Sequence, residues 1–262
     1  MAPERLQKIL AELGYGSRRS CEILIQEGRV RVNQMIAQIG MKADIEKDTI
    51  WVDNQPVPKP PPPVYIALNK PSGVLSDIEP KNDPRKTVRD LVDVPGHLFS
   101  VGRLDFDSEG LILLTNDGDL ANTLTHPRYG HEKEYRVLLA NRPDDKQLEA
   151  WRHGVILEDG HRTAPAMVRV ENQAGKGAWV RVVMKEGHKR QIREICKQIG
   201  LGVIRLIRVR IGTLELGVLK PGEWRYLTTS EIRSLKSAQS NKPRKRASPF
   251  GQKKTLKKNT LT

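Results

Sequence analysis

The sequence predicts an α+β fold in which two folded parts are joined by a stiff linker and followed by a basic tail. The proline-rich stretch QPVPKPPPP, residues 55–63, divides a short first part from a longer second part. In the second part, segments with strand periodicity and segments with helical periodicity are mixed without regular alternation, which indicates a mixed, largely antiparallel sheet. From residue 236 to residue 262 the chain is polar, basic and rich in serine, proline and lysine, a composition that predicts disorder.

The first part, residues 1–54, is predicted to be a small α-rich domain. Four apolar residues at helical spacing predict a first helix, which Gly14 ends: Leu6, Ile9, Leu10 and Leu13. Ser17 is a suitable N-cap for a second helix, which Gly28 ends. The segment RVRVN, residues 29–33, then alternates as a strand does, so its two arginines are expected on one face.

Residues 55–63 are predicted to form a linker, and residues 64–235 the second domain. A run so rich in proline cannot continue a helix or a central strand, and it favours the extended polyproline conformation of a stiff spacer. The strands predicted after it cover residues 64–68, 111–115, 134–139, 166–170, 179–184 and 203–211. The predicted helices cover residues 119–124, 144–152 and 189–199.

The charge of the chain predicts a polyanionic partner. The formal net charge is +14, and the eight basic residues from residue 241 onward are accompanied by no acid. Removing those eight charges from +14 leaves +6 on the rest of the chain. Because the body is basic as well as the tail, nucleic acid is favoured over a membrane surface as the partner.

Cysteine usage and hydropathy indicate a cytoplasmic protein that does not associate with a membrane. Cys21 and Cys196 are too few and too far apart for a disulfide framework or a zinc site, which fits a reducing compartment. No apolar stretch approaches the length of a membrane span. The N-terminal sequence MAPERLQKIL also lacks the apolar region of a signal peptide.

The stretch VGRLDFDSEGLILLTNDG, residues 101–118, places three acids at alternate positions before a glycine: Asp105, Asp107 and Glu109. A calcium-binding EF-hand loop would need a glutamate at its twelfth position, which is Asn116 here, and it would lead into a helix instead of an apolar strand. A solvated turn and a catalytic carboxylate remain as alternatives. Arg103 and Asp105 would point to the same side of an extended segment, where the guanidinium would keep the carboxylate ionised for covalent catalysis.

Two further segments carry side chains that could meet this aspartate. In KEYRV, residues 133–137, Tyr135 places a phenol on a predicted strand, as either a core aromatic or part of a site. In EGHKRQIREICKQI, residues 186–199, four apolar residues predict one buried helix face. Lys189, Arg190 and Arg193 lie beside or opposite that face, which is typical of a solvated basic surface, and spacing alone indicates no more.

Five motifs in the same order as in a known family carry a resemblance: LNKPSG (68–73), GRLDFDSEGLILLTNDG (102–118), KEYRV, EGHKRQIREI (186–195) and KPGEW (220–224). Together they resemble a family of ribosomal-RNA pseudouridine synthases, the one that includes the small-subunit uridine synthases. The resemblance extends from about Val64 to Leu227. His188, Lys189 and Glu194 depart from the residues common in that family. Residues 5–33, RLQKILAELGYGSRRSCEILIQEGRVRVN, resemble the S4 RNA-binding domain, which is named after ribosomal protein S4.

The resemblance implies a site-specific isomerisation of uridine to pseudouridine in ribosomal RNA. The glycosidic bond breaks, the uracil rotates and the base is rejoined through a ring carbon, so there is no net redox change or hydrolysis, and no cofactor and no metal are expected. Asp105 matches the catalytic aspartate, and Tyr135 matches the tyrosine that packs on the uracil. Arg193 matches the basic residue that pairs with the aspartate, and Arg103 matches the arginine near the vacated base.

The resemblance also implies RNA contacts on both domains. They are expected at Arg5, Lys8, Arg18, Arg19, Arg29 and Arg31 in the first domain and at Lys189 and Arg190 in the second, and Lys70 is expected either to contact RNA or only to shape its loop. The motif sequence DSEGLILLTNDG and the basic C-terminal extension favour large-subunit over small-subunit ribosomal RNA as the substrate. We expect a monomer that acts on ribosomal RNA or on a ribosome-assembly intermediate. The alternative from another class is a non-catalytic RNA-binding assembly factor that keeps the fold.

Overall fold

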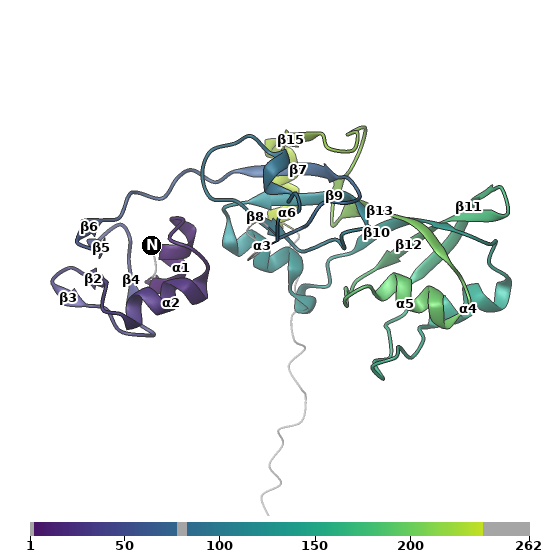
Figure 1. The fold of residues 1–262 in the computed structure, drawn as a ribbon, viewed down its shortest axis with the longest axis horizontal. Coiled ribbons are helices and arrows are strands. Elements are labelled where there is room, and N and C mark those ends of the chain that lie inside the picture. The colour runs from purple at the N-terminus through teal and green to yellow at the C-terminus, as the bar shows by residue number, and fades with distance from the viewer. Residues whose placement is uncertain (1–2, 78–82, 238–262) are drawn as a thin grey trace, which may run out of the picture.

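The computed structural model describes residues 3–77 and 83–237. Figure 1 shows a small N-terminal unit beside a larger part that is built on one long, twisted sheet, and an extended segment connects the two. Among the described residues, no helix has both the length and the apolar character needed to span a bilayer.

The N-terminal unit combines two helices with short strands. Its elements are β1 (Glu4–Arg5), α1 (Leu6–Glu12), α2 (Arg18–Gln26), β2 (Val30–Val32), β3 (Met35–Ile36), β4 (Lys42–Ala43), β5 (Ile50–Val52) and β6 (Gln55–Pro56). Both predicted helices and the predicted strand are present, and the Ser17 hydroxyl accepts a hydrogen bond from the Ser20 amide at the start of α2. A sheet of order β3-β2-β5-β6 gives the unit more strand than the sequence predicts.

One apolar core holds the N-terminal unit together, and the proline-rich segment leaves from it. The helices and the sheet bury apolar side chains against one another, among them Leu6, Leu10, Cys21 and Ile50. The first two residues of the predicted linker form β6, which pairs with β5. Pro56 is tolerated there because β6 is an edge strand, where a missing amide costs no ladder bond. Residues 57–64 have no regular secondary structure.

The larger part is built on a sheet of order β11-β12-β10-β13-β9-β7-β15, with β14 paired to β13 and β8 paired to β9. Every pairing in it is antiparallel except that of β13 with β9, so the predicted largely antiparallel sheet is confirmed. The strands are β7 (Tyr65–Lys70), β8 (Phe99–Val101), β9 (Glu109–Thr115), β10 (Lys133–Leu139), β11 (Met167–Ala174), β12 (Gly177–Met184), β13 (Val203–Ile211), β14 (Leu214–Glu215) and β15 (Trp224–Tyr226).

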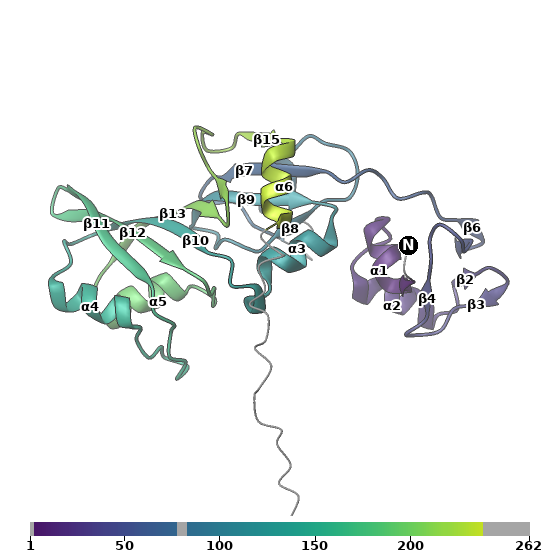
Figure 2. The same ribbon diagram turned by 180° about the vertical axis from the view of Figure 1, so that it is seen from behind.

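Two pairs of helices cover different stretches of this sheet, as Figures 1 and 2 show. Helices α4 (Asp145–His153) and α5 (Gln191–Gln198) bury Trp151 and Ile195 against β10, β12 and β13. Helices α3 (Gly118–Thr125) and α6 (Thr229–Ser237) bury Leu120 and Leu235 against β7 and β9. Two short 3₁₀ turns, Arg89–Leu91 and Pro127–Tyr129, also occur among the described residues.

The predicted elements are present with ends that differ by a few residues, but the predicted start of the tail is wrong. Residue 236 lies inside α6, which continues to Ser237. The Lys236 ammonium lies 2.9 Å from an Asp117 carboxylate oxygen and donates a 2.8 Å hydrogen bond to the Tyr65 hydroxyl. This helix is therefore packed on the sheet, and the rest of the predicted disordered tail, residues 238–262, lies outside the described residues.

Candidate active site

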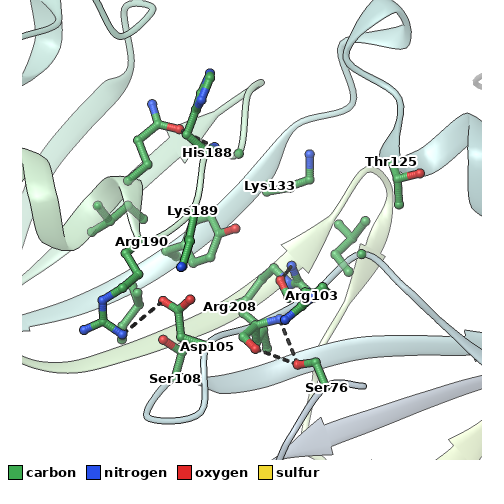
Figure 3. Close-up of a pocket in the computed structure, with 18 of the residues that line it drawn as sticks. Ser76, Arg103, Asp105, Ser108, Thr125, Lys133, His188, Lys189, Arg190 and Arg208 are labelled. Carbon is green, nitrogen blue, oxygen red and sulfur yellow. Dashed lines mark hydrogen bonds and ion pairs between the residues drawn. The ribbon is translucent and has the colours of Figure 1, made fainter. Parts of the chain in front are cut away.

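A cavity of about 740 Å³ lies between the two pairs of helices. Its walls come from the loop between β8 and β9, from β10 and β13, and from the segment between β12 and α5. It therefore brings together five residues that the sequence analysis singled out: Arg103, Asp105, Tyr135, Lys189 and Arg190. In Figure 3, Asp105 lies between Lys189 and Arg190 on one side and Arg103 and Arg208 on the other.

Ser76 holds the loop that carries Asp105 through hydrogen bonds to its backbone. The Ser76 hydroxyl donates a 2.6 Å hydrogen bond to the Leu104 carbonyl and accepts a 3.0 Å bond from the Leu104 amide. A turn follows, in which the Ser108 amide donates to the Asp105 carbonyl at 3.0 Å. The backbone on both sides of the aspartate is thereby fixed, which orients its carboxylate towards the cavity.

Lys70 supports the same loop from β7. Its side chain is fully buried, and its ammonium donates hydrogen bonds to the carbonyls of Ser108 (2.7 Å), Pro71 (3.0 Å) and Phe106 (3.3 Å). Burial lowers the pKa of Lys70 to about 8, against the opposing attraction of nearby carboxylates such as that of Asp107. Of the two roles expected for Lys70, its contacts fit the shaping of the loop and not an RNA contact, because the ammonium is enclosed by the loop that it stabilises.

Replacing Lys70 by methionine should lower the free energy of unfolding by about 1–3 kcal/mol near neutral pH, because the carbonyls would lose their donor. The pKa of Lys70 is about 8 in the folded chain, below its ordinary value of 10.5. Between these values the unfolded chain holds a proton that the folded chain has lost, so the stability of wild type relative to Lys70→Met should rise with pH. Urea unfolding between pH of about 8 and about 10 measures this. The control is Lys47→Met, which changes an exposed lysine. If the difference in unfolding free energy between wild type and Lys70→Met fell with rising pH, the lowered pKa of Lys70 would be contradicted.

Arg208 is one of the residues at the cavity that the sequence analysis did not single out, together with Ser76 and Lys133. It is 2% exposed on β13, where its Nε donates to the Leu111 carbonyl at 2.7 Å and its Nη1 to the Arg103 carbonyl at 3.3 Å. Its Nη2 is buried at the cavity with no hydrogen-bond partner among the described residues. The available signal was an arginine two positions from Leu206, on the buried face of a predicted strand.

The ion pairs around the acids differ from those predicted. Arg193 lies on α5 outside the cavity lining, and its Nη2 is 3.2 Å from both the carboxylate and the carbonyl of Asp107. Arg190 is the arginine near Asp105, with Nη1 3.9 Å from Oδ2, and it also lies 3.3 Å from Asp107. Although burial raises the pKa of Asp107, the hydrogen bond from Arg190 and the charges of both arginines lower it overall. Instead of the predicted ion pair of Arg193 with Asp105, Arg190 lies near Asp105 and Arg193 pairs with Asp107.

Arg103 and Tyr135 both line the cavity but differ in exposure. The Arg103 side chain is 73% exposed and its Nη2 is 3.3 Å from Asp77, so the predicted pairing with Asp105 is not made. Residues 103–105 lie outside any strand, so the extended segment assumed from the sequence is not formed there. Tyr135 is 8% exposed; it packs in the core under α4 and α5 and also lines the cavity. Both interpretations offered for its phenol therefore apply.

Cationic side chains outnumber carboxylates among the described residues that line the cavity: seven lysines and arginines face three acids, Asp77, Asp105 and Glu186. Lys133, on β10, lines it beside Arg208, and burial together with the Arg208 charge lowers the pKa of Lys133. Lys189 points towards Asp105 in Figure 3. Glu109, the third acid of the motif, lies outside the lining and pairs with Arg205 at 2.7 Å, so the three acids do not form a calcium cage. The cavity suits a polyanionic ligand that presents a neutral group to Asp105.

The predicted RNA contacts of the N-terminal unit fall into two groups. Arg5 and Arg18 are exposed and line a surface hollow together with Lys42, which the sequence analysis did not single out; Arg19 is exposed as well. Lys8, by contrast, is 2.6 Å from Glu4 and 2.9 Å from Asp119 of α3, and thus links the two parts of the chain.

The remaining two arginines of that unit also have protein partners. Arg29 makes two hydrogen bonds to the carboxylate of Asp53, at 2.7 and 2.6 Å, and Arg31 stacks on the Trp51 ring at 5.8 Å. Lys8 and Arg29 are consequently the least available of the predicted phosphate contacts.

Comparison with known proteins identifies the fold and the chemistry. The RNA pseudouridylate synthase family matches residues 64–198, which include the whole loop around Asp105. The chain belongs to this family. The S4 domain matches residues 4–50 of the N-terminal unit. The chain is thus an RNA pseudouridine synthase with an N-terminal S4 domain, and the predicted family is confirmed.

Relatives along almost the whole length support the same assignment. An uncharacterized RNA pseudouridine synthase of Aquifex aeolicus (strain VF5) is 42% identical over 250 residues, which cover 94% of this chain and 100% of that protein. Ribosomal large subunit pseudouridine synthase B of Bacillus subtilis (strain 168) is 38% identical over 89% of this chain and 96% of its own length. The crystal structure of a pseudouridylate synthase, 32% identical, superposes with a TM-score of 0.63 over 88% of this chain and 99% of that one.

Proposed function

We propose that this synthase converts one uridine of large-subunit ribosomal RNA to pseudouridine, with Asp105 as the catalytic residue. The observation that supports this proposal is the position of Asp105: a 26% exposed carboxylate on the wall of a cationic cavity, in a loop held by Ser76, Lys70 and Arg208. The relatives named as ribosomal large subunit pseudouridine synthase B, from Bacillus subtilis and Pseudomonas aeruginosa, support the substrate.

The cavity is large enough for a nucleotide that has left its stack. Its volume, about 740 Å³, lies within the range typical of small-molecule sites. Extruding a base costs a few kcal/mol, least in a loop or bulge. Lys133 and Lys189 would offset this cost by binding phosphate oxygens of the extruded nucleotide and its neighbours. Arg103, exposed at the mouth, is placed to fill the position that the base leaves.

The chemistry needs a carboxylate and a means of holding the free uracil. The bond from C1′ to N1 breaks and a bond from C1′ to C5 forms, while the proton lost from C5 is balanced by the proton gained at N1. Tyr135, buried on the wall of the cavity, packs on the uracil while it rotates. Arg190, 3.9 Å from Asp105, takes the pairing role that the sequence analysis gave to Arg193. Arg193 instead holds the turn through Asp107.

The partner is ribosomal RNA, free or in a ribosome-assembly intermediate, and the protein acts as a cytoplasmic monomer. Mapping pseudouridines in ribosomal RNA from cells with and without the protein tests the function. We expect one position of large-subunit RNA to lose its pseudouridine and to regain it with the wild-type gene. If instead a pseudouridine of small-subunit RNA were lost, the proposed large-subunit substrate would be wrong. Unchanged RNA, together with no conversion of transcribed RNA by the purified protein, would favour the non-catalytic assembly factor.

The S4 domain should contribute affinity through phosphate contacts at the hollow of Arg5, Arg18 and Lys42. Arg18→Gln should weaken RNA binding and reduce the slope of log affinity against log salt by about 0.7, as expected for one lost contact with single-stranded RNA. The matched control is Lys47→Gln, an exposed lysine of the same domain outside the hollow. Filter-binding titrations at several salt concentrations measure both slopes, and equal slopes for the two variants would contradict the role of the hollow.

A further inference from the structure

A cluster of three side chains that could ligate a metal ion lies at the cavity: His161, Glu186 and His188, of which the last two line it. His161 belongs to the loop between α4 and β11, where Ile156 pairs with Arg162, and the other two follow β12. One potential ligand atom from each residue lies within 4.8 Å of the other two. The two imidazole rings are stacked with centroids 3.9 Å apart. Residues separated by more than twenty positions thus converge on one point.

Glu186 is already oriented for such a role by hydrogen bonds to one of its oxygens. Its Oε1 accepts from the Ala164 amide at 2.8 Å and from the Gln191 side-chain amide. Its Oε2 lies 3.9 Å from Nε2 of His161. One oxygen is therefore held by neighbours while the other faces the histidine, the arrangement in which surrounding hydrogen bonds orient a metal-ligating carboxylate.

His161 has a ring nitrogen that the described residues leave unsatisfied. Its Nε2 is buried and has no hydrogen-bond partner among them, although the Glu186 carboxylate is near. A buried nitrogen without a partner costs free energy, and a metal ion would satisfy it with the lone pair of the neutral imidazole.

We propose that His161, Glu186 and His188 bind a zinc ion. Two imidazoles and one carboxylate are a ligand set that zinc accepts, with a fourth position left for water. Bonds of about 2.0–2.1 Å at tetrahedral angles place ligand atoms about 3.3 Å apart. The 3.9 Å separation of His161 and Glu186 needs only a small side-chain movement to reach that distance. The sequence analysis considered zinc only through the two cysteines, and this histidine pair is visible only once the chain has folded.

The ion would stabilise one wall of the active site. Glu186 and His188 immediately precede Lys189 and Arg190, which reach Asp105 and Asp107. Bound zinc would tie this segment to the loop of His161, and thereby fix the backbone that carries both cations. Zinc binding itself does not rest on the proposed function, so its test needs no turnover.

The test is zinc binding by the full-length, untagged protein after removal of metal by a chelator. Isothermal titration with zinc chloride should give one saturable site per chain. His161→Gln and His188→Gln should each weaken binding at least about tenfold, the lower end of what even supporting residues of a metal site contribute. His153→Gln, an exposed histidine of α4 outside the cluster, should bind zinc as the wild type does.

Absence of saturable binding, or binding that both cluster variants retain in full, would overturn the proposal. Circular dichroism checks that each variant is folded. X-ray absorption at the zinc edge of the wild-type protein gives a result that does not depend on the variants. A zinc coordination shell of two imidazoles and oxygen ligands would support the site. A sulfur ligand would exclude it, because the two cysteines, Cys21 and Cys196, are buried in cores and do not belong to the cluster.

Discussion

Asp105→Asn should reduce pseudouridine formation to background, a loss of about 10³-fold or more, while RNA binding is retained. The substitution removes the charge and nearly preserves the shape, and loss of a catalytic group typically costs rates on this scale. Affinity for RNA comes largely from phosphate contacts, and those proposed here lie at other residues of the cavity and on the S4 domain. The loop should keep its conformation, since Ser76, Lys70 and Arg208 bind its backbone and not the Asp105 carboxylate.

Asp107→Asn is the matched control for this prediction. The carboxylate of Asp107 holds Arg190 and Arg193 but is absent from the cavity lining, so its loss should loosen the turn and reduce the rate far less. Single-turnover conversion with saturating RNA measures both variants, with folding checked by circular dichroism and deamidation excluded by mass spectrometry. Full activity of folded Asp105→Asn would reject the mechanism. A larger loss in Asp107→Asn would transfer the catalytic role to that residue.

Local periodicity was sufficient to predict most of the longer elements. The strand β12 and the helix α5 follow directly from apolar residues at intervals of two and of three to four, because each buries one face in the core. Short strands such as β4, β6 and β15 carry too few residues for any period. They exist because a distant partner is in place: β15 pairs with β7, more than 150 positions earlier in the chain.

The composition of the site was predictable, but its pairing was not. The motifs indicated that Asp105, Tyr135 and the basic segment before α5 belong together, and the cavity unites them. Which arginine pairs with which acid depends on backbone details that residue spacing does not carry. One is the turn after Asp105, and another is the left-handed conformation of Arg190, with φ of 54°. Arg208 could not be placed for a related reason, since its contacts span about a hundred residues.

Gly110→Ala should strongly destabilise the fold, because β9 passes against β13 at this residue. Gly110 pairs with Arg208 in the parallel register of β9 and β13. A Cβ atom added there would lie 2.3 Å from the Arg208 carbonyl oxygen and 2.6 Å from its amide nitrogen. The residue also has φ of +104°, a conformation that side chains disfavour. Overpacking and backbone strain together predict a loss of about 2–5 kcal/mol in the free energy of unfolding.

The matched control is Gly96→Ala, which separates the close approach from the backbone strain. Gly96 has a similar φ of +94°, but an added Cβ would meet no atom within 4 Å, so only the strain of about 1–2 kcal/mol should remain. Urea unfolding measures both variants. Because the strand pair at Gly110 also anchors the loop of Asp105 through Arg208, the surviving folded fraction of Gly110→Ala should convert uridine slowly, whereas Gly96→Ala should convert it at the wild-type rate. Equal destabilisation of the two variants would mean that the strands can separate at no cost, and that Arg208 does not hold the catalytic loop rigidly.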